Sequence, residues 1–162
     1  MRTLKLQDMI YAGVPDENQV DRIVEYHMEP INEIGHSVHI DHVVCYRSKK
    51  YEAMNRRRPV TDTIFTEYPV LVGRNYWSQH CFEKSDKQPD GLGACDISSR
   101  NLLSLASLLV EHTSYCRYAY YHHKNFIHCD YAHEYDEPKY YGSDWRELSE
   151  QEYFDRIYKY TL

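Results

Sequence analysis

The chain is organised around residues 78–97, SQHCFEKSDKQPDGLGACDI, read together with residues 126–131, FIHCDY. These two segments supply His80, Asp96 and His128, which are two imidazoles and one carboxylate. Such a set can hold zinc and still leave one coordination position open to water or substrate. Because metal ligands have to converge, and because neighbouring antiparallel strands bring distant residues together, the two segments are expected to lie side by side.

The first third of the chain predicts a helix followed by a buried strand. Apolar residues recur at helical spacing after Pro15 and Asp16, and Gly35 is expected to end this helix. Pro30 lies inside the pattern and is expected to kink or restart the helix, because proline cannot donate a backbone hydrogen bond. Residues 37–46 then predict a buried strand.

The remaining pattern mixes helices and strands, and it indicates an α+β fold with a small antiparallel sheet that carries the zinc site, flanked by helices. Residues 1–162 are read as one domain, with a core over 1–131 and a C-terminal extension over 132–162. The expected elements are a polar helix over 49–58, a β-prone stretch over 60–72, a surface loop over 83–91, a strand over 94–97, a helix over 100–111, two antiparallel strands over 117–121 and 126–131, and a C-terminal helix after Ser149.

Composition and charge indicate which classes of binding partner the protein is not expected to have. A chain of 162 residues with 42% hydrophobic residues can build one core. The net charge of −6 without a basic block argues against nucleic acid as a partner, and no window is apolar enough to predict a membrane span. The first residues lack the apolar core of a secretory signal, which predicts a protein that stays in the cytoplasm as synthesised.

The 5 cysteines show no paired short spacing, so they are read as small reduced residues rather than as a disulfide framework or a CxxC metal clip.

Four short motifs follow one another in an order that resembles the zinc D-Ala-D-Ala carboxypeptidase family, which belongs to a superfamily with the lysostaphin-type peptidases and the hedgehog fold. The motifs are Tyr46-Arg47-Ser48, Ser78-Gln79-His80, Gly93-Ala94-Cys95-Asp96-Ile97 and His128-Cys129-Asp130. Each is weak alone, but the four together in this order are specific, and they span about residues 1–131.

The resemblance implies roles for individual residues. His80, Asp96 and His128 would be the ligands of one zinc ion. Arg47 is similar to the family arginine that holds a substrate carboxylate or steadies a developing oxyanion, a task that suits its forked donors. Ser78 resembles the family serine near the substrate backbone.

Asp130 matches the acidic position of the final motif. It is expected to orient a ligand imidazole or the substrate rather than to bind the metal.

The chain departs from the family pattern at two places. Sixteen positions separate His80 from Asp96, more than twice the family interval, so the loop over 83–91 reads as an insertion beside the metal that could cover or reshape the cleft. Many relatives carry a glutamate three residues before the last histidine, where this chain has Asn125. His123, or its neighbour His122, would then serve as the proton-transfer group.

The resemblance implies a zinc metallopeptidase that cleaves peptidoglycan stem peptides, as a carboxypeptidase or an endopeptidase. With no secretory signal, a phage endolysin or a virion-associated enzyme that reaches the cell wall after release is the expected setting. The alternative is a non-catalytic zinc-stabilised module of the same fold that binds a protein or polysaccharide. A nucleic-acid enzyme built on the run from His39 to His42 is a third reading.

Overall fold

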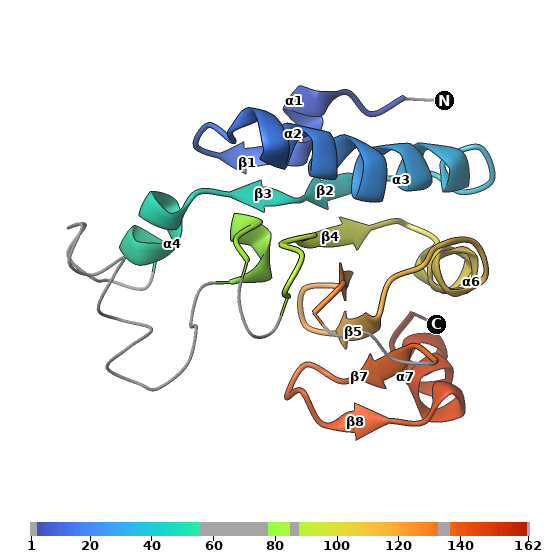
Figure 1. Cartoon of the computed structure of the whole chain (residues 1–162). Coiled ribbons are helices and arrows are strands. Elements are labelled where there is room, and N and C mark those ends of the chain that lie inside the picture. The colour runs from blue at the N-terminus through green and yellow to red at the C-terminus, as the bar shows by residue number, and fades with distance from the viewer. Residues whose placement is uncertain (1–2, 56–77, 85–87, 133–136, 162) are drawn as a thin grey trace.

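The computed structural model describes residues 3–55, 78–84, 88–132 and 137–161 (Figure 1). The first half contains a short lead-in and the helical segment that was expected, and then two short strands and a helix. These elements are α1 (Leu6–Met9), β1 (Ile10–Ala12), α2 (Glu17–Ile23), η1 (Val24–Met28), α3 (Glu29–Ile34), β2 (His42–Val44), β3 (Tyr46–Arg47) and α4 (Lys49–Asn55).

The second half supplies most of the sheet and two further helices. Its elements are η2 (Gln79–Cys81), β4 (Ala94–Ser98), α6 (Leu102–His112), β5 (Arg117–Tyr121), β6 (Phe126–Asp130), β7 (Lys139–Tyr141), β8 (Glu147–Leu148) and α7 (Glu150–Thr161). The β-prone stretch over 60–72 and the end of the helix expected over 49–58 lie outside the described residues.

The main sheet is mixed, with strand order β2-β4-β6-β5-β7-β8. All neighbouring pairs are antiparallel except β5 and β7, which run parallel. The α+β class is therefore confirmed, whereas the expectation of a purely antiparallel sheet is wrong. The reason is that the chain crosses over after β6 and adds β7 beside β5, so that part of the C-terminal segment extends the sheet.

Alternation along β4 divides the sheet into a buried core face and a partly buried face. Cys95 and Ile97 are fully buried, whereas Asp96 and Ser98 are only partly buried, as expected for side chains that point to opposite faces of a strand. The core face joins one apolar cluster with the helices, including Ile31 from α3. Figure 1 shows α2 and α3 lying along β2 and β3, and α6 and α7 side by side at the end of the molecule away from α4.

Local sequence explains how the first helix begins and where it departs from regular α-helical geometry. The Asp16 side chain accepts a hydrogen bond from Gln19 N, and the Gln19 side chain accepts from Asp16 N, which together form a capping box. Pro30 lies in the first turn of α3, and the backbone stays helical from η1 through Met28 and Glu29 into α3. The π-helical turn η1 precedes it, so the helix restarts rather than breaks. π-Helical turns are rare in proteins overall, but those that occur are often found at functional sites.

The strand expected over 37–46 is shorter than expected. Only His42–Val44 and Tyr46–Arg47 form strands, because the backbone around Val38 still continues the turn that ends α3. Val38 N donates to Ile34 O at 3.2 Å. The short strand Tyr46–Arg47 also pairs in parallel with β1, outside the main sheet.

The described parts of the loop over 83–91 are held against α2. Arg22 donates to Gly91 O at 2.9 Å and to Phe82 O at 3.0 Å, and Gln88 is 2% exposed. Gly93, directly before β4, has φ of 83°, and a Cβ there would lie 2.3 Å from the Phe82 ring. Glycine is therefore required at this approach to the strand.

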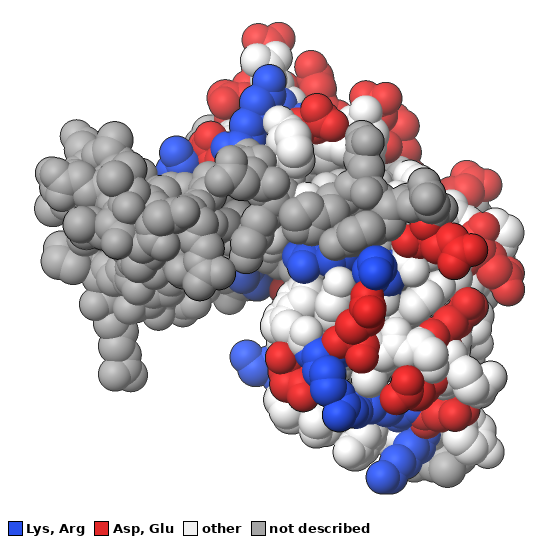
Figure 2. All heavy atoms as spheres, turned by 60° about the horizontal axis from the view of Figure 1, so that its bottom comes forward, with Lys and Arg blue, Asp and Glu red and all other residues white. Residues whose placement is uncertain are grey.

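Charge on the visible surface is mixed. Figure 2 shows Lys and Arg interspersed with Asp and Glu, with no continuous basic area among the described residues on that face. Among the described residues, no helix is both long and apolar enough to cross a lipid bilayer.

Candidate metal centre

Strand pairing brings two of the expected ligands together. In the β4–β6 ladder Asp96 lies directly opposite His128, so both side chains are on the same face of the sheet. His128 Nδ1 is 2.8 Å from Asp96 Oδ1. His80 arrives from η2, and its Nε2 is 3.3 Å from the same carboxylate oxygen. The three side chains thus place donor atoms within 4.8 Å of one another, around Asp96 Oδ1.

Each of the two imidazoles donates a hydrogen bond from its other nitrogen, and the two acceptors differ. His80 Nδ1–H donates to the Cys45 carbonyl at 2.7 Å. His128 Nε2–H donates to Asp130 Oδ2 at 2.8 Å. Metal-binding histidines nearly always donate their other N–H to a carbonyl or carboxylate, which fixes the tautomer and the ring orientation. The set therefore fits zinc, with His80 Nε2, His128 Nδ1 and Asp96 Oδ1 as donors.

Asp130 is itself held by a charge-assisted pair. Arg117 Nε and Nη2 lie 2.9 and 2.7 Å from the two Asp130 carboxylate oxygens, and Ala132 N donates to Oδ1. Asp130 is completely buried. Its expected role of orienting a ligand imidazole agrees with this geometry, while contact with a substrate would require it to become exposed.

The arrangement shifts the pKa values of His128, Asp96 and Asp130. Burial lowers the pKa of His128, but its hydrogen bonds to Asp130 and Asp96 more than offset burial and raise it to about 9. Burial raises the pKa values of Asp96 and Asp130, yet the neighbouring imidazoles, with Arg117 in the case of Asp130, hold both far below the usual range. Without metal, His128 is a cation between two carboxylates.

This charge distribution predicts that the metal-free protein loses stability as the pH rises. The folded-state pKa of His128 lies above its ordinary value of 6.5, so the stabilisation is fully present below about pH 6.5 and is lost as the pH rises through about 9. The loss should reach up to about 3 kcal/mol. Urea unfolding of the metal-free protein between pH 6 and about pH 10 measures it. Asp130→Asn should show a smaller decline, and a stability that rises over this range would contradict the assignment.

Arg47 touches the metal centre through Asp96. Its Nη2 lies 3.2 Å from Asp96 Oδ2, and its Nη1 lies 3.2 Å from Glu52 Oε1. Asp96 therefore offers Oδ1 to the two imidazoles while Arg47 holds Oδ2. Glu52 was not predicted from the sequence, because a single glutamate in a polar helix is typical of any solvated surface.

A cleft of 400 Å³ opens beside Arg47 and Asp96. Tyr11, Tyr51 and Lys124 contribute to its walls. Tyr11 and Tyr51 contact each other edge to face at 5.4 Å between ring centroids, so one side of the cleft is aromatic.

Ser78 and His123 make contacts in the structure other than the ones that their expected roles require. The Ser78 hydroxyl accepts a hydrogen bond from His80 N at 3.2 Å, and so caps the turn that presents His80. His123 Nδ1 lies 3.1 Å from His122 Nε2 in the exposed turn between β5 and β6. The contacts found among the described residues do not join His123 to the metal centre, so its proton-transfer role stays a prediction.

Trp145 is a site residue that the sequence did not reveal. Its ring meets His128 edge to face at 5.3 Å, and the Arg117 guanidinium lies 4.6 Å from its centroid. It comes from the turn between β7 and β8, with φ of 60°, a conformation that is costly for a bulky side chain. No local pattern marks this tryptophan, because its place depends on β7 pairing with β5.

Comparison with known proteins gives no relative. No family model, curated protein or solved structure matches this chain.

Proposed function

We propose that the protein is a zinc-dependent peptidase that cleaves peptidoglycan stem peptides, as a carboxypeptidase or an endopeptidase. The observation that carries the proposal is the convergence of His80, Asp96 and His128, each imidazole being fixed through its other nitrogen, beside an accessible cleft. The order of the four motifs, which resembles the zinc D-Ala-D-Ala carboxypeptidase family, supplies the substrate class. Action on the wall after release at lysis, or as part of a virion, belongs to the same proposal.

The residues around the centre have distinct tasks in this reaction. A bound zinc ion would lower the pKa of a water molecule and polarise the scissile carbonyl. Arg47 orients the ligand carboxylate of Asp96 and presents its guanidinium at the cleft, where a peptide carboxylate or a developing oxyanion can be held. His123 is the candidate for moving the proton to the leaving amine. Asp130, backed by Arg117, keeps His128 in its metal-binding tautomer.

A second candidate function is a non-catalytic zinc module of the same fold. The observation in its favour is that Arg47 already has acidic partners on both sides, Asp96 and Glu52. In addition, Asn125 stands where many relatives of the resembled family have a glutamate. In such a module the metal would stabilise the sheet while the tyrosine-rich surface binds a partner.

Digestion of purified cell walls distinguishes the two functions. The zinc-loaded protein should reduce the turbidity of the walls and release shortened stem peptides, identified by mass spectrometry. A chelator should stop the reaction, and added zinc should restore it. A folded protein that holds zinc at this centre and leaves every stem peptide intact would contradict the peptidase and support the module.

Trp145 is expected to contribute to catalysis through its contact with the His128 ring. Replacing it with alanine should lower kcat/KM on wall fragments about fivefold, because an aromatic contact contributes roughly 1 kcal/mol. Trp145→Phe should retain most of the activity.

Trp145→Gly is the matched control for the turn, since glycine adopts the left-handed conformation without strain. Equal losses in the alanine and glycine variants would assign the effect to the indole ring. Full activity in Trp145→Gly would show that the ring has no part in the reaction.

A further inference from the structure

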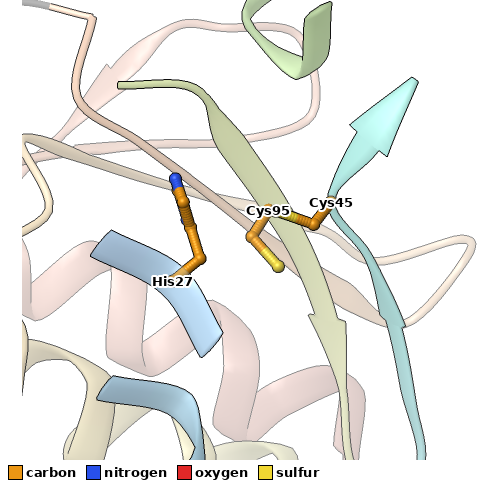
Figure 3. A group of neighbouring side chains, drawn as sticks. All are labelled: His27, Cys45 and Cys95. Carbon is orange, nitrogen blue, oxygen red and sulfur yellow. The ribbon is translucent and has the colours of Figure 1, made fainter. Parts of the chain in front are cut away.

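A second group of metal-ligating side chains lies behind the first, on the core face of β4. His27 from η1, Cys45 between β2 and β3, and Cys95 on β4 place donor atoms within 4.8 Å of one another. All three residues are completely buried. Figure 3 shows their side chains entering one space between the helix and the two strands. Cys95 and Asp96 are adjacent in sequence and point to opposite faces, so the two groups lie on either side of the same strand.

Hydrogen bonds prepare His27 as a ligand. Its Nε2 lies 2.6 Å from the Leu92 carbonyl, which can only accept, so the ring proton is on Nε2. Nδ1 then carries the lone pair, and it lies 2.8 Å from the Tyr115 hydroxyl, which donates to it. An imidazole that gives one N–H to a backbone carbonyl and keeps the other nitrogen as a base has the form found in metal sites. Burial lowers the pKa of His27 to about 3, so the ring is neutral.

Net charge decides which ion fits this space. A fully buried site is stable only if its charges nearly cancel, because the low-dielectric interior penalises an unpaired charge. Two thiolates, one neutral imidazole and one divalent cation sum to zero. Cysteine sulfur and histidine nitrogen are the ligands of structural zinc sites, whereas the mixed nitrogen and oxygen donors of His80, Asp96 and His128 are typical of catalytic sites.

We propose that His27, Cys45 and Cys95 bind a second zinc ion that has a structural role. The two S–H bonds break on binding, two Zn–S bonds form, and the two protons pass to solvent. His27 would bind the ion through Nδ1, in place of the hydrogen bond from the Tyr115 hydroxyl.

This ion would hold the backbone that carries the first centre. The Cys45 carbonyl accepts the hydrogen bond from His80 Nδ1, and Cys95 directly precedes Asp96. Fixing both cysteines therefore fixes two of the three ligands on the opposite face. The inference does not depend on the proposed peptidase function.

Cobalt substitution tests the site in the reduced, folded protein. Thiolate sulfur transfers charge to Co²⁺ and gives an intense near-ultraviolet band, which the nitrogen and oxygen donors of the first centre do not give. The wild-type protein loaded with Co²⁺ under reductant should show this band. His80→Ala should keep it, while Cys95→Ala and Cys45→Ala should each lose it. Cys116→Ser is the control, because Cys116 is a thiol outside the group.

Zinc content gives an independent readout. The wild-type protein should hold two zinc ions per chain, and Cys95→Ala and His80→Ala one each. If Cys95→Ala does not fold, the comparison of wild type with His80→Ala still decides the question. A folded, reduced wild-type protein without the sulfur band would overturn the proposal. So would a Cys45–Cys95 disulfide, found by mass spectrometry, that persists in the metal-loaded protein.

Discussion

Replacing Asp96 with alanine is expected to remove one zinc equivalent from the protein and to reduce cell-wall cleavage by more than about 100-fold. The estimate is a lower bound, because losing even an outer-shell partner of a ligand costs about 10- to 100-fold in metal affinity or activity. Asp96 Oδ1 is the atom that both imidazoles approach, at 2.8 and 3.3 Å, so no other described carboxylate takes its position. Metal analysis and the turbidity of purified walls measure the two effects.

Asp41→Ala is the matched control for this experiment. Asp41 is also a carboxylate in an ion pair, but it pairs with Arg100 near the edge of the sheet, away from the metal centre. Its loss should change neither zinc content nor cleavage. An Asp96→Ala variant that keeps both at the wild-type level would contradict the assignment of the centre. Loss of zinc from the variant, with no cleavage even by the wild type, would favour the module.

Replacing Arg117 with alanine is expected to destabilise the fold by about 3 kcal/mol or more. The change removes the guanidinium that binds both oxygens of the completely buried Asp130 carboxylate and leaves His128 as its remaining described cation. Breaking a buried ion pair by removing one partner typically costs about 3–5 kcal/mol. The stacking of the guanidinium on Trp145 is lost as well. Urea unfolding at neutral pH of the metal-free protein measures the change in the free energy of unfolding.

Arg100→Ala provides the control, because Arg100 also pairs with an aspartate but its side chain is 75% exposed. Exposed pairs contribute less than about 1 kcal/mol, so this variant should unfold close to the wild type. Arg117→Lys should recover part of the loss, since lysine restores the charge without the two-pronged contact. Equal stabilities of the Arg117→Ala and Arg100→Ala variants would show that the buried chain of charges does not support the fold.

Short-range signals explain which elements could be predicted. The helix starting after Asp16 depends on a capping box between residues three apart, and the C-terminal helix depends on Ser149 and Glu152 in the same way. The strands over 117–121 and 126–131 are joined by a short turn, so their pairing is a local event. The strand over 37–46 was predicted too long, because hydrophobic alternation cannot show that the backbone near Val38 still belongs to the end of α3.

The first candidate metal centre was within reach of the sequence, because Asp96 and His128 lie in short motifs on adjacent strands and His80 lies in a third short motif, on η2. The residues that support these ligands could not be predicted from the sequence. Arg117 and Trp145 act through Asp130 and His128, and Trp145 arrives only because β7 pairs in parallel with β5 after a crossover. The cysteines looked isolated in the sequence, since Cys45 and Cys95 share no short spacing. Tertiary pairing places them beside His27 of the π-helical turn.

Local sequence was sufficient to predict the α+β class, the positions of the capped helices, and the candidate ligands His80, Asp96 and His128. These follow from interactions between residues close in the chain and from the chemistry of the side chains. Long-range packing established the parallel β7 strand, the Arg117–Asp130–His128 series of charged groups and the buried group on the other face of β4. These depend on which distant segments pack together, and that choice is made by the free energy of the whole core rather than by any local stretch.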